Sequence, residues 1–239
     1  MANKFFITFA FALSFILPAI NFSSSIYKPY TTGVDVSWPN CGEKLPTNQD
    51  FAIIGVTGGL DFRPNKCIGE EASQLRNDPS FYVNTGYPGH IYADKYQSNP
   101  KNCSLRDYEC LAYNYGFNAG RYAVNYSLEN GVVSNKWWLD VETINSWTSN
   151  PNINKAELVG EEQAIKQGVN PTMIGYYTYP PEWQMLTNNW QNKLPTWVAS
   201  NSNYRNDAIN LCGSKGFTGG PIYLTQYTTT LDYDYACVI

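Results

Sequence analysis

Short apolar runs of four to six residues recur along most of the chain, and this pattern constrains the fold more than any other feature. Each run is bounded by Gly, Pro or Asn, which favour turns, as is typical of strands. Eight runs are predicted to be strands: residues 33–37, 51–56, 81–84, 119–124, 137–142, 173–177, 196–199 and 222–227.

Segments with helical spacing separate several of these runs. The clearest is 155–167, for which Asn154 is the predicted N-cap and Gly168 the predicted residue after the last turn. Further helices are predicted at residues 70–76, 105–116 and 181–186. Strands that alternate with helices favour a parallel barrel or a doubly wound sheet. Because several connections are too short for eight helices, we expect an irregular α/β barrel of the TIM type, with about eight strands and a reduced set of helices.

The first apolar run, residues 5–20, follows Lys4 and precedes a polar stretch with three serines. It is about 16 residues long and falls short of the roughly 20 that span a bilayer. Residues 1–24 are therefore predicted to be a cleaved secretory signal rather than a membrane anchor. No linker or repeat divides the remainder, and no later segment is apolar enough to span a membrane. Residues 25–239 are thus predicted to form one domain, secreted or associated with a cell wall.

All six cysteines follow the predicted signal, and none lies in a C-x-x-C pair. An even number of cysteines in an exported chain indicates disulfides, with a metal–thiolate site as the alternative. The sequence leaves the connectivity open. Pairing of neighbours along the chain predicts three bonds: Cys41–Cys67, Cys103–Cys110 and Cys212–Cys237.

Composition excludes several classes of function. With 16 basic and 20 acidic residues the net charge is −4, which argues against binding to nucleic acid through its phosphates. The single histidine, His90, excludes zinc sites and catalytic schemes that need two imidazoles. It is not accompanied by the G-x-S-x-G turn of serine hydrolases. We expect neither a metal nor a cofactor, and we expect a monomer.

Two carboxylates, Asp140 and Glu142, lie at the end of the run 137–142. Side chains two residues apart share one face of a strand, with Cα atoms roughly 6.5–7 Å apart. Crowding and burial raise the pKa of one member, so that one stays protonated while its neighbour stays anionic. Glycoside hydrolysis requires this division between an acid and an anion.

Further acids follow other predicted strands: Asp35 in the run 33–37, and Asp232 and Asp234 after 222–227. If all the strands are parallel, these acids gather at the C-terminal mouth of one barrel, where catalytic groups of this architecture lie. A Ca²⁺ site is the alternative, but no D-x-D-x-D-G loop is present. Sugar binding also requires aromatic platforms and amides, and the candidates are Trp38, Asn84, Tyr87, Tyr126, Trp147, Tyr177, Tyr179 and Gln226.

Six short motifs occur in an order that resembles glycoside hydrolase family 25, the Chalaropsis-type lysozymes: 33–37, 51–54, 139–143, 174–178, 196–199 and 225–227, followed by Asp232. The resemblance implies an irregular (β/α) barrel that cleaves the β-1,4 bond between N-acetylmuramic acid and N-acetylglucosamine in peptidoglycan. It implies that Glu142 is the general acid/base and that Asp140 assists the acetamido group of the substrate or stabilises the cationic intermediate. Asp35 resembles a supporting acid, and Asp232 the last aspartate of the family.

The chain departs from the family at two places. The second strand is followed by Val56-Thr57-Gly58-Gly59, where the family often has an acid, and the third predicted strand reads Tyr82-Val83-Asn84-Thr85 instead of a Tyr-His-Phe pattern. Two other functions therefore stay open. One is a non-catalytic barrel that binds carbohydrate or cell wall, and the other is a glycosidase that acts on another polysaccharide.

Overall fold

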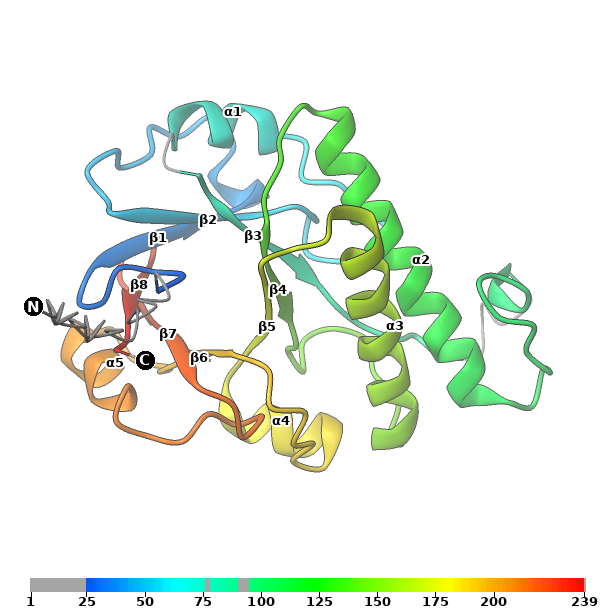
Figure 1. Ribbon diagram of the computed structural model, residues 1–239. Coiled ribbons are helices and arrows are strands. Elements are labelled where there is room, and N and C mark those ends of the chain that lie inside the picture. The colour runs from blue at the N-terminus through cyan, green and yellow to red at the C-terminus, as the bar shows by residue number, and fades with distance from the viewer. Residues whose placement is uncertain (1–24, 76–77, 90–94, 239) are drawn as a thin grey trace, which may run out of the picture.

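A computed structural model describes residues 25–75, 78–89 and 95–238, and these form a closed barrel of eight strands in chain order (Figure 1). The predicted signal at 1–24 and His90 lie outside the described residues. The strands are β1 (Thr32–Val36), β2 (Phe51–Gly55), β3 (Ser80–Asn84), β4 (Lys136–Asp140), β5 (Met173–Thr178), β6 (Thr196–Ala199), β7 (Ile222–Thr228) and β8 (Asp232–Ala236).

Strands β1 to β7 are parallel, and β8 runs antiparallel between β7 and β1. The expectation that all strands are parallel is therefore wrong for β8. Only residues 229–231 join β7 to β8, and so short a connection permits a hairpin but no crossover. Because β8 is reversed, its first residue, Asp232, lies at the barrel end where the other strands finish and pairs with Asp35.

The strand predicted at 119–124 is wrong, because this segment belongs to the long helix α2 (Tyr108–Glu129). The residues Leu111, Tyr115, Ala119 and Ala123 are buried at helical spacing, so the apolar run is one stripe of a helix. The helix predicted at 105–116 is the first half of α2. The eighth strand of the barrel is β8, in a segment for which no strand was predicted.

Four further helices connect the strands: α1 (Ile68–Gln74), α3 (Pro151–Val169), α4 (Pro180–Thr187) and α5 (Arg205–Leu211). A short 3₁₀ helix, η1 (Trp38–Asn40), follows β1. The helices predicted near α1, α3 and α4 are confirmed, whereas α5 was not predicted. The predicted caps of α3 are wrong. Asn150 caps its N-terminus, and Asn170 ends it in a left-handed conformation.

The barrel has two apolar layers, because side chains alternate along each strand. Trp137 points outward with Ile54 and Phe81 toward the helices, whereas Trp138 points inward with Ile53 and other side chains of the barrel interior. The inner layer is closed by Tyr27, whose hydroxyl accepts a hydrogen bond from the Trp138 indole at 2.9 Å. This layer fills the barrel interior below its C-terminal mouth.

All three predicted disulfides are confirmed: Cys41–Cys67, Cys103–Cys110 and Cys212–Cys237. The six cysteines are all used, so the metal–thiolate alternative is wrong. The bond from Cys212 to Cys237 ties the end of α5 to the residue that follows β8. Within the part of the chain that the structure describes, no helix combines the length and apolar character needed to cross a membrane.

Helices α2 and α3 lie side by side on one flank of the barrel (Figure 1). Glycines permit this close approach. A Cβ on Gly116 would lie 2.0 Å from the carbonyl oxygen of Glu157, and a Cβ on Gly160 would lie 2.0 Å from that of Tyr113. Between the helices, Glu157 and Glu161 are fully buried. Burial is the main cause of the raised pKa of both carboxyls. The charge of Asp61 raises both pKa values further, and the charge of Glu161 also raises that of Glu157, whereas a hydrogen bond with Glu157 lowers that of Glu161.

We expect Gly160→Ala to destabilise the protein by roughly 1–3 kcal/mol, because the added methyl group forces the two helices apart. Thermal unfolding should then occur roughly 2–4 °C lower for each kcal/mol lost in a domain of this size. Gly69→Ala in α1 is the matched control, because a Cβ there meets nothing within 4 Å. Equal melting temperatures for Gly160→Ala and the wild type would contradict the close helix contact.

We expect Glu161→Gln to stabilise the protein more at pH 7 than at pH 4. An unfolded glutamate releases its proton near pH 4.3, whereas the folded protein keeps the proton because the pKa of Glu161 is raised. The wild type therefore loses stability as the pH rises from about 4.3 toward the folded pKa, and the variant does not. Thermal melts across this range measure the difference, with the exposed Glu129→Gln as control. A difference independent of pH would show that Glu161 is ionised in the folded protein.

Candidate active site

A cavity of about 120 Å³ opens at the C-terminal mouth of the barrel, above the inner apolar layer. It is lined by Asp35, Tyr82, Asp140, Glu142, Tyr177, Trp197, Gln226 and Asp232. The structure therefore brings together the four acids that the sequence singled out, from β1, the end of β4 and the start of β8. We call this space the carboxylate cavity.

Asp140 is the last residue of β4 and is held by Asn84, the last residue of β3. Parallel register places the two opposite each other, and the Asn84 amide donates to Oδ2 of Asp140 at 2.6 Å. The carbonyl of the same amide accepts from the Thr57 hydroxyl and the Gly59 N–H, both at 3.0 Å. Asn84 was predicted to bind substrate, and in this structure its side chain contacts Asp140, Thr57 and Gly59.

Glu142 lies two residues beyond Asp140 and is only half-buried, so it is the more open of the two. Its backbone carbonyl accepts from the Asn145 N–H at 3.1 Å and from the Trp147 indole at 2.8 Å. These contacts fix the turn that carries Glu142. Trp147, a predicted sugar platform, is therefore a support for this turn.

The pKa values of both acids are raised. For Asp140 burial is the main cause, and the charge of Glu142 adds to it. For Glu142 burial is again the main cause, followed by the charges of Glu182 and Asp232. Because the two groups interact closely, they titrate as a pair, and the pair retains one proton above the usual range of a carboxyl group.

Asp35 is joined to the opposite wall of the cavity through Gln226. The Gln226 amide donates to Oδ2 of Asp35 at 3.0 Å, and its carbonyl accepts from the Tyr177 hydroxyl at 2.7 Å. Burial raises the pKa of Asp35, and the charge of Asp232 raises it further. Asp232 accepts from the Thr228 hydroxyl at 2.6 Å, across the hairpin. No Lys or Arg is among the residues that line the cavity, so protons balance much of its negative charge.

The predicted sugar platforms fall into two groups. Trp38 is 48% exposed and Tyr179 is 38% exposed, so both rings are open to a ligand. Tyr87 is only 3% exposed and packs on Tyr115, and the hydroxyl of Tyr126 donates to the Asn65 carbonyl. Neither Tyr87 nor Tyr126 lines the carboxylate cavity. Tyr126 lies on α2, because the segment before it is helical and not the predicted strand.

Three contributors to the site were missed by sequence reasoning. Tyr82 and Trp197 line the cavity, and the alternation of side chains along β3 and β6 is the signal that could have found them. Glu182 lies in the first turn of α4, where its carboxylate accepts from the Thr143 N–H at 2.7 Å. Only the fold reveals that Glu182 is next to the turn that carries Glu142.

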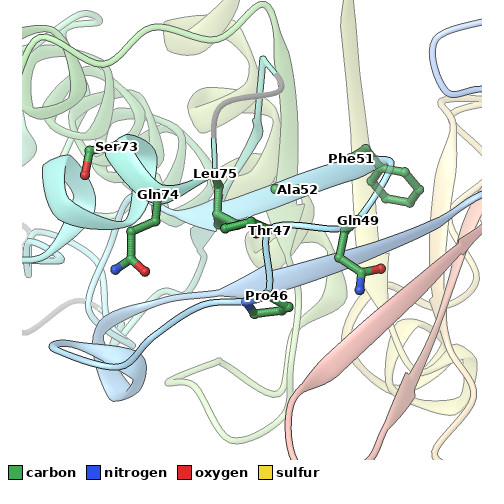
Figure 2. Close-up of a pocket in the computed structure, with 8 residues that line it drawn as sticks. All are labelled: Pro46, Thr47, Gln49, Phe51, Ala52, Ser73, Gln74 and Leu75. Carbon is green, nitrogen blue, oxygen red and sulfur yellow. The ribbon is translucent and has the colours of Figure 1, made fainter.

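A larger hollow of about 650 Å³ lies at the other end of the barrel, where β2 begins (Figure 2). It is lined by Pro46, Thr47, Gln49, Phe51, Ala52, Ser73, Gln74 and Leu75. It has no titratable side chain, so it offers no acid or base. Among residues 25–75, 78–89 and 95–238, no group of three His, Cys, Asp or Glu side chains is placed to hold a metal ion.

The barrel is similar to two solved structures. One is a muramidase from Trichobolus zukalii, with 16% identity and a TM-score of 0.53 over 87% of this chain and 94% of the other. The second is the spore cortex lytic enzyme SleM from Clostridium perfringens, with 14% identity and a TM-score of 0.56 over 87% of this chain and 67% of the other. Neither a protein-family model nor a curated protein matches the sequence. The irregular barrel that the resemblance to glycoside hydrolase family 25 implies is thereby confirmed as the fold.

Proposed function

We propose that the protein is a glycoside hydrolase of lysozyme type that cleaves β-1,4 bonds in peptidoglycan. The observation that carries this proposal is the gathering of Asp35, Asp140, Glu142 and Asp232 around one cavity at the C-terminal mouth of the barrel. The fold that the chain shares with a muramidase and a spore cortex lytic enzyme supports the choice of substrate.

In the proposed reaction Glu142 is the acid that protonates the oxygen of the leaving sugar. It is the more open member of the pair, so a glycosidic oxygen can approach it, and its raised pKa keeps a proton available. Asp140 is deeper and fixed by Asn84. Its Oδ1 has no hydrogen-bond partner among the described residues, so it is free to accept from the acetamido N–H of the substrate or to stabilise positive charge on the sugar ring.

The remaining groups support this pair. Asp35 and Asp232 line the opposite side of the cavity, and a carboxylate that is ionised there favours a cationic transition state. Trp38 and Tyr179 offer exposed rings on which sugar units can stack. The three disulfides favour an oxidising compartment, in line with export guided by residues 1–24. We also propose that the protein acts as a monomer.

A non-catalytic barrel that binds cell wall is the second candidate, and one observation favours it. Where the family often has an acid after the second strand, this chain has Gly58 and Gly59, and the Gly59 N–H is bonded to Asn84. The Asn84 amide is thus contacted by the backbone N–H of Gly59, and positions 58 and 59 supply no carboxylate. Binding to insoluble peptidoglycan without release of any soluble product would establish this function instead.

We expect Glu142→Gln to reduce the release of reducing ends from purified peptidoglycan on the order of 10²–10⁴-fold, because the amide cannot donate the catalytic proton. Binding to the insoluble polymer and the melting temperature should stay close to wild type, since glutamine preserves the shape. The exposed Glu129→Gln is the control and should remain fully active. Unchanged activity in Glu142→Gln would show that Glu142 is not the catalytic acid.

We expect Glu182→Gln to move the alkaline limb of the pH–activity profile to lower pH. The charge of Glu182 raises the pKa of Glu142, so removing that charge lowers it. The general acid then loses its proton at a lower pH, and activity falls at that lower pH. Glutamine can still accept from the Thr143 N–H, so the turn should persist. The measurement is kcat/KM against pH, and a limb that stays in place or moves upward would contradict the electrostatic role of Glu182.

A further inference from the structure

Another hollow, somewhat larger than the carboxylate cavity, lies beside it, among residues that follow β2, β3 and β4 and one residue of α2. Its volume is about 190 Å³, and it is lined by Leu60, Asp61, Thr85, Gly86, Pro88, Tyr115, Asn145 and Ser146. We call it the side pocket. None of its lining residues has a role in the reaction proposed above.

The side pocket adjoins the proposed catalytic pair directly. The N–H and the hydroxyl of Thr85 both donate to the backbone carbonyl of Asp140, at 3.0 and 2.7 Å. The N–H of Asn145 donates to the backbone carbonyl of Glu142 at 3.1 Å. Residues of the side pocket thus hold the backbone of both acids. A glycan positioned over Glu142 can therefore extend a substituent of an adjacent sugar into the side pocket.

Two polar atoms of the side pocket lack hydrogen-bond partners among the described residues. Oδ2 of Asp61 accepts from the Tyr115 hydroxyl at 3.0 Å. Oδ1 of Asp61 and the amide nitrogen of Asn145 have no partner among the described residues, and both atoms are shielded from solvent. Such orphaned polar atoms are costly and uncommon in folded proteins. A ligand that enters the pocket and supplies a donor and an acceptor removes this cost.

The charge of the pocket favours a neutral ligand. Burial raises the pKa of Asp61 to about 8, so the group carries a proton at neutral pH. No Lys or Arg lines the pocket, so it holds no charge that would attract a carboxylate. A carboxylic acid presents one O–H donor and an acceptor oxygen, and a carboxamide presents two N–H donors and an acceptor oxygen. That set is complementary to an amide, which presents an N–H and a carbonyl.

Gly86 keeps the space open. A Cβ at this position would lie 3.5 Å from Oδ2 of Asp61 and 3.6 Å from Cβ of Asn145. The φ of Gly86 is not positive, so its conformation alone does not require glycine. The absence of a side chain at this position instead leaves room between Asp61 and Asn145.

We propose that the side pocket is a substrate subsite that binds a neutral amide group, the acetamido group of the sugar next to the one at Glu142, through Asp61 and Asn145. The proposal rests on the proposed function, because it takes the substrate to be an N-acetylated glycan. It adds a determinant of specificity that lies outside the carboxylate cavity.

The test is calorimetric binding of a soluble glycan fragment of alternating N-acetylmuramic acid and N-acetylglucosamine to the Glu142→Gln protein, which prevents turnover. The same fragment after chemical removal of the acetyl groups is the second ligand. In this background Gly86→Ala, which fills the pocket, should weaken binding of the acetylated fragment roughly tenfold, as loss of an amide contact would. Binding of the deacetylated fragment should not change. Gly69→Ala is the matched control.

A second set of variants keeps the test decisive if Gly86→Ala folds poorly, since its Cβ also lies 3.0 Å from the Ser146 carbonyl. Asp61→Asn retains a donor and an acceptor and should bind the acetylated fragment within about twofold of its parent. Asp61→Leu and Asn145→Ala should lose roughly tenfold. Equal loss for both ligands, or no loss, would overturn the subsite.

Failure of the subsite and failure of the proposed function give different results. If the wild type cleaves peptidoglycan but the pocket variants bind both fragments like their parent, only the subsite is overturned. If the variants discriminate between the fragments but the wild type releases no product, the subsite is supported and the proposed catalytic function is overturned.

Discussion

The hydrogen bond between Asn84 and Asp140 is the contact on which the mouth of the barrel depends. It follows from the parallel register of β3 and β4, which places the last residues of both strands opposite each other. Because the Asn84 carbonyl also accepts from Thr57 and Gly59, the same amide joins the loop after β2 to this pair of strands. One side chain thus sets the position of the deepest proposed catalytic acid relative to three strands.

Burying several acids at one end of a barrel is unfavourable, and the interior below them offsets this cost. Trp138, Trp197 and Tyr27 fill the inner layer, with the two indole rings 5.9 Å apart. Each fully buried side chain of this kind contributes roughly 1.5–3 kcal/mol relative to exposure. The interior is therefore divided along its axis, with apolar packing beneath and acids above. The acids remain tolerable because protons reduce their charge, as their raised pKa values indicate.

The architecture and the four acids could be predicted because they depend on local patterns. Apolar runs bounded by turn residues locate seven of the eight strands, and the spacing of Asp140 and Glu142 identifies the acid pair. The run 119–124 was assigned wrongly because a short apolar stripe has the same composition in a helix as in a strand. Strand β8 was missed because its two aspartates interrupt the apolar residues, so that it does not form an apolar run, and it is held as a strand by pairing with β1 and β7. Glu182 and Asp61 gain their significance from neighbours distant in sequence, which no local pattern encodes.

Strand β8 has two roles: it closes the barrel, and it carries acids of the candidate site. The strand that completes the hydrogen bonding of β1 and β7 also supplies Asp232 and Asp234, and it is anchored behind by the Cys212–Cys237 bond. A partly folded chain without this strand has two unpaired edges, and it also lacks Asp232 at the mouth and the buried Asp234. Pairing of β8 therefore completes both the hydrogen bonding of the barrel and the set of acids around the carboxylate cavity.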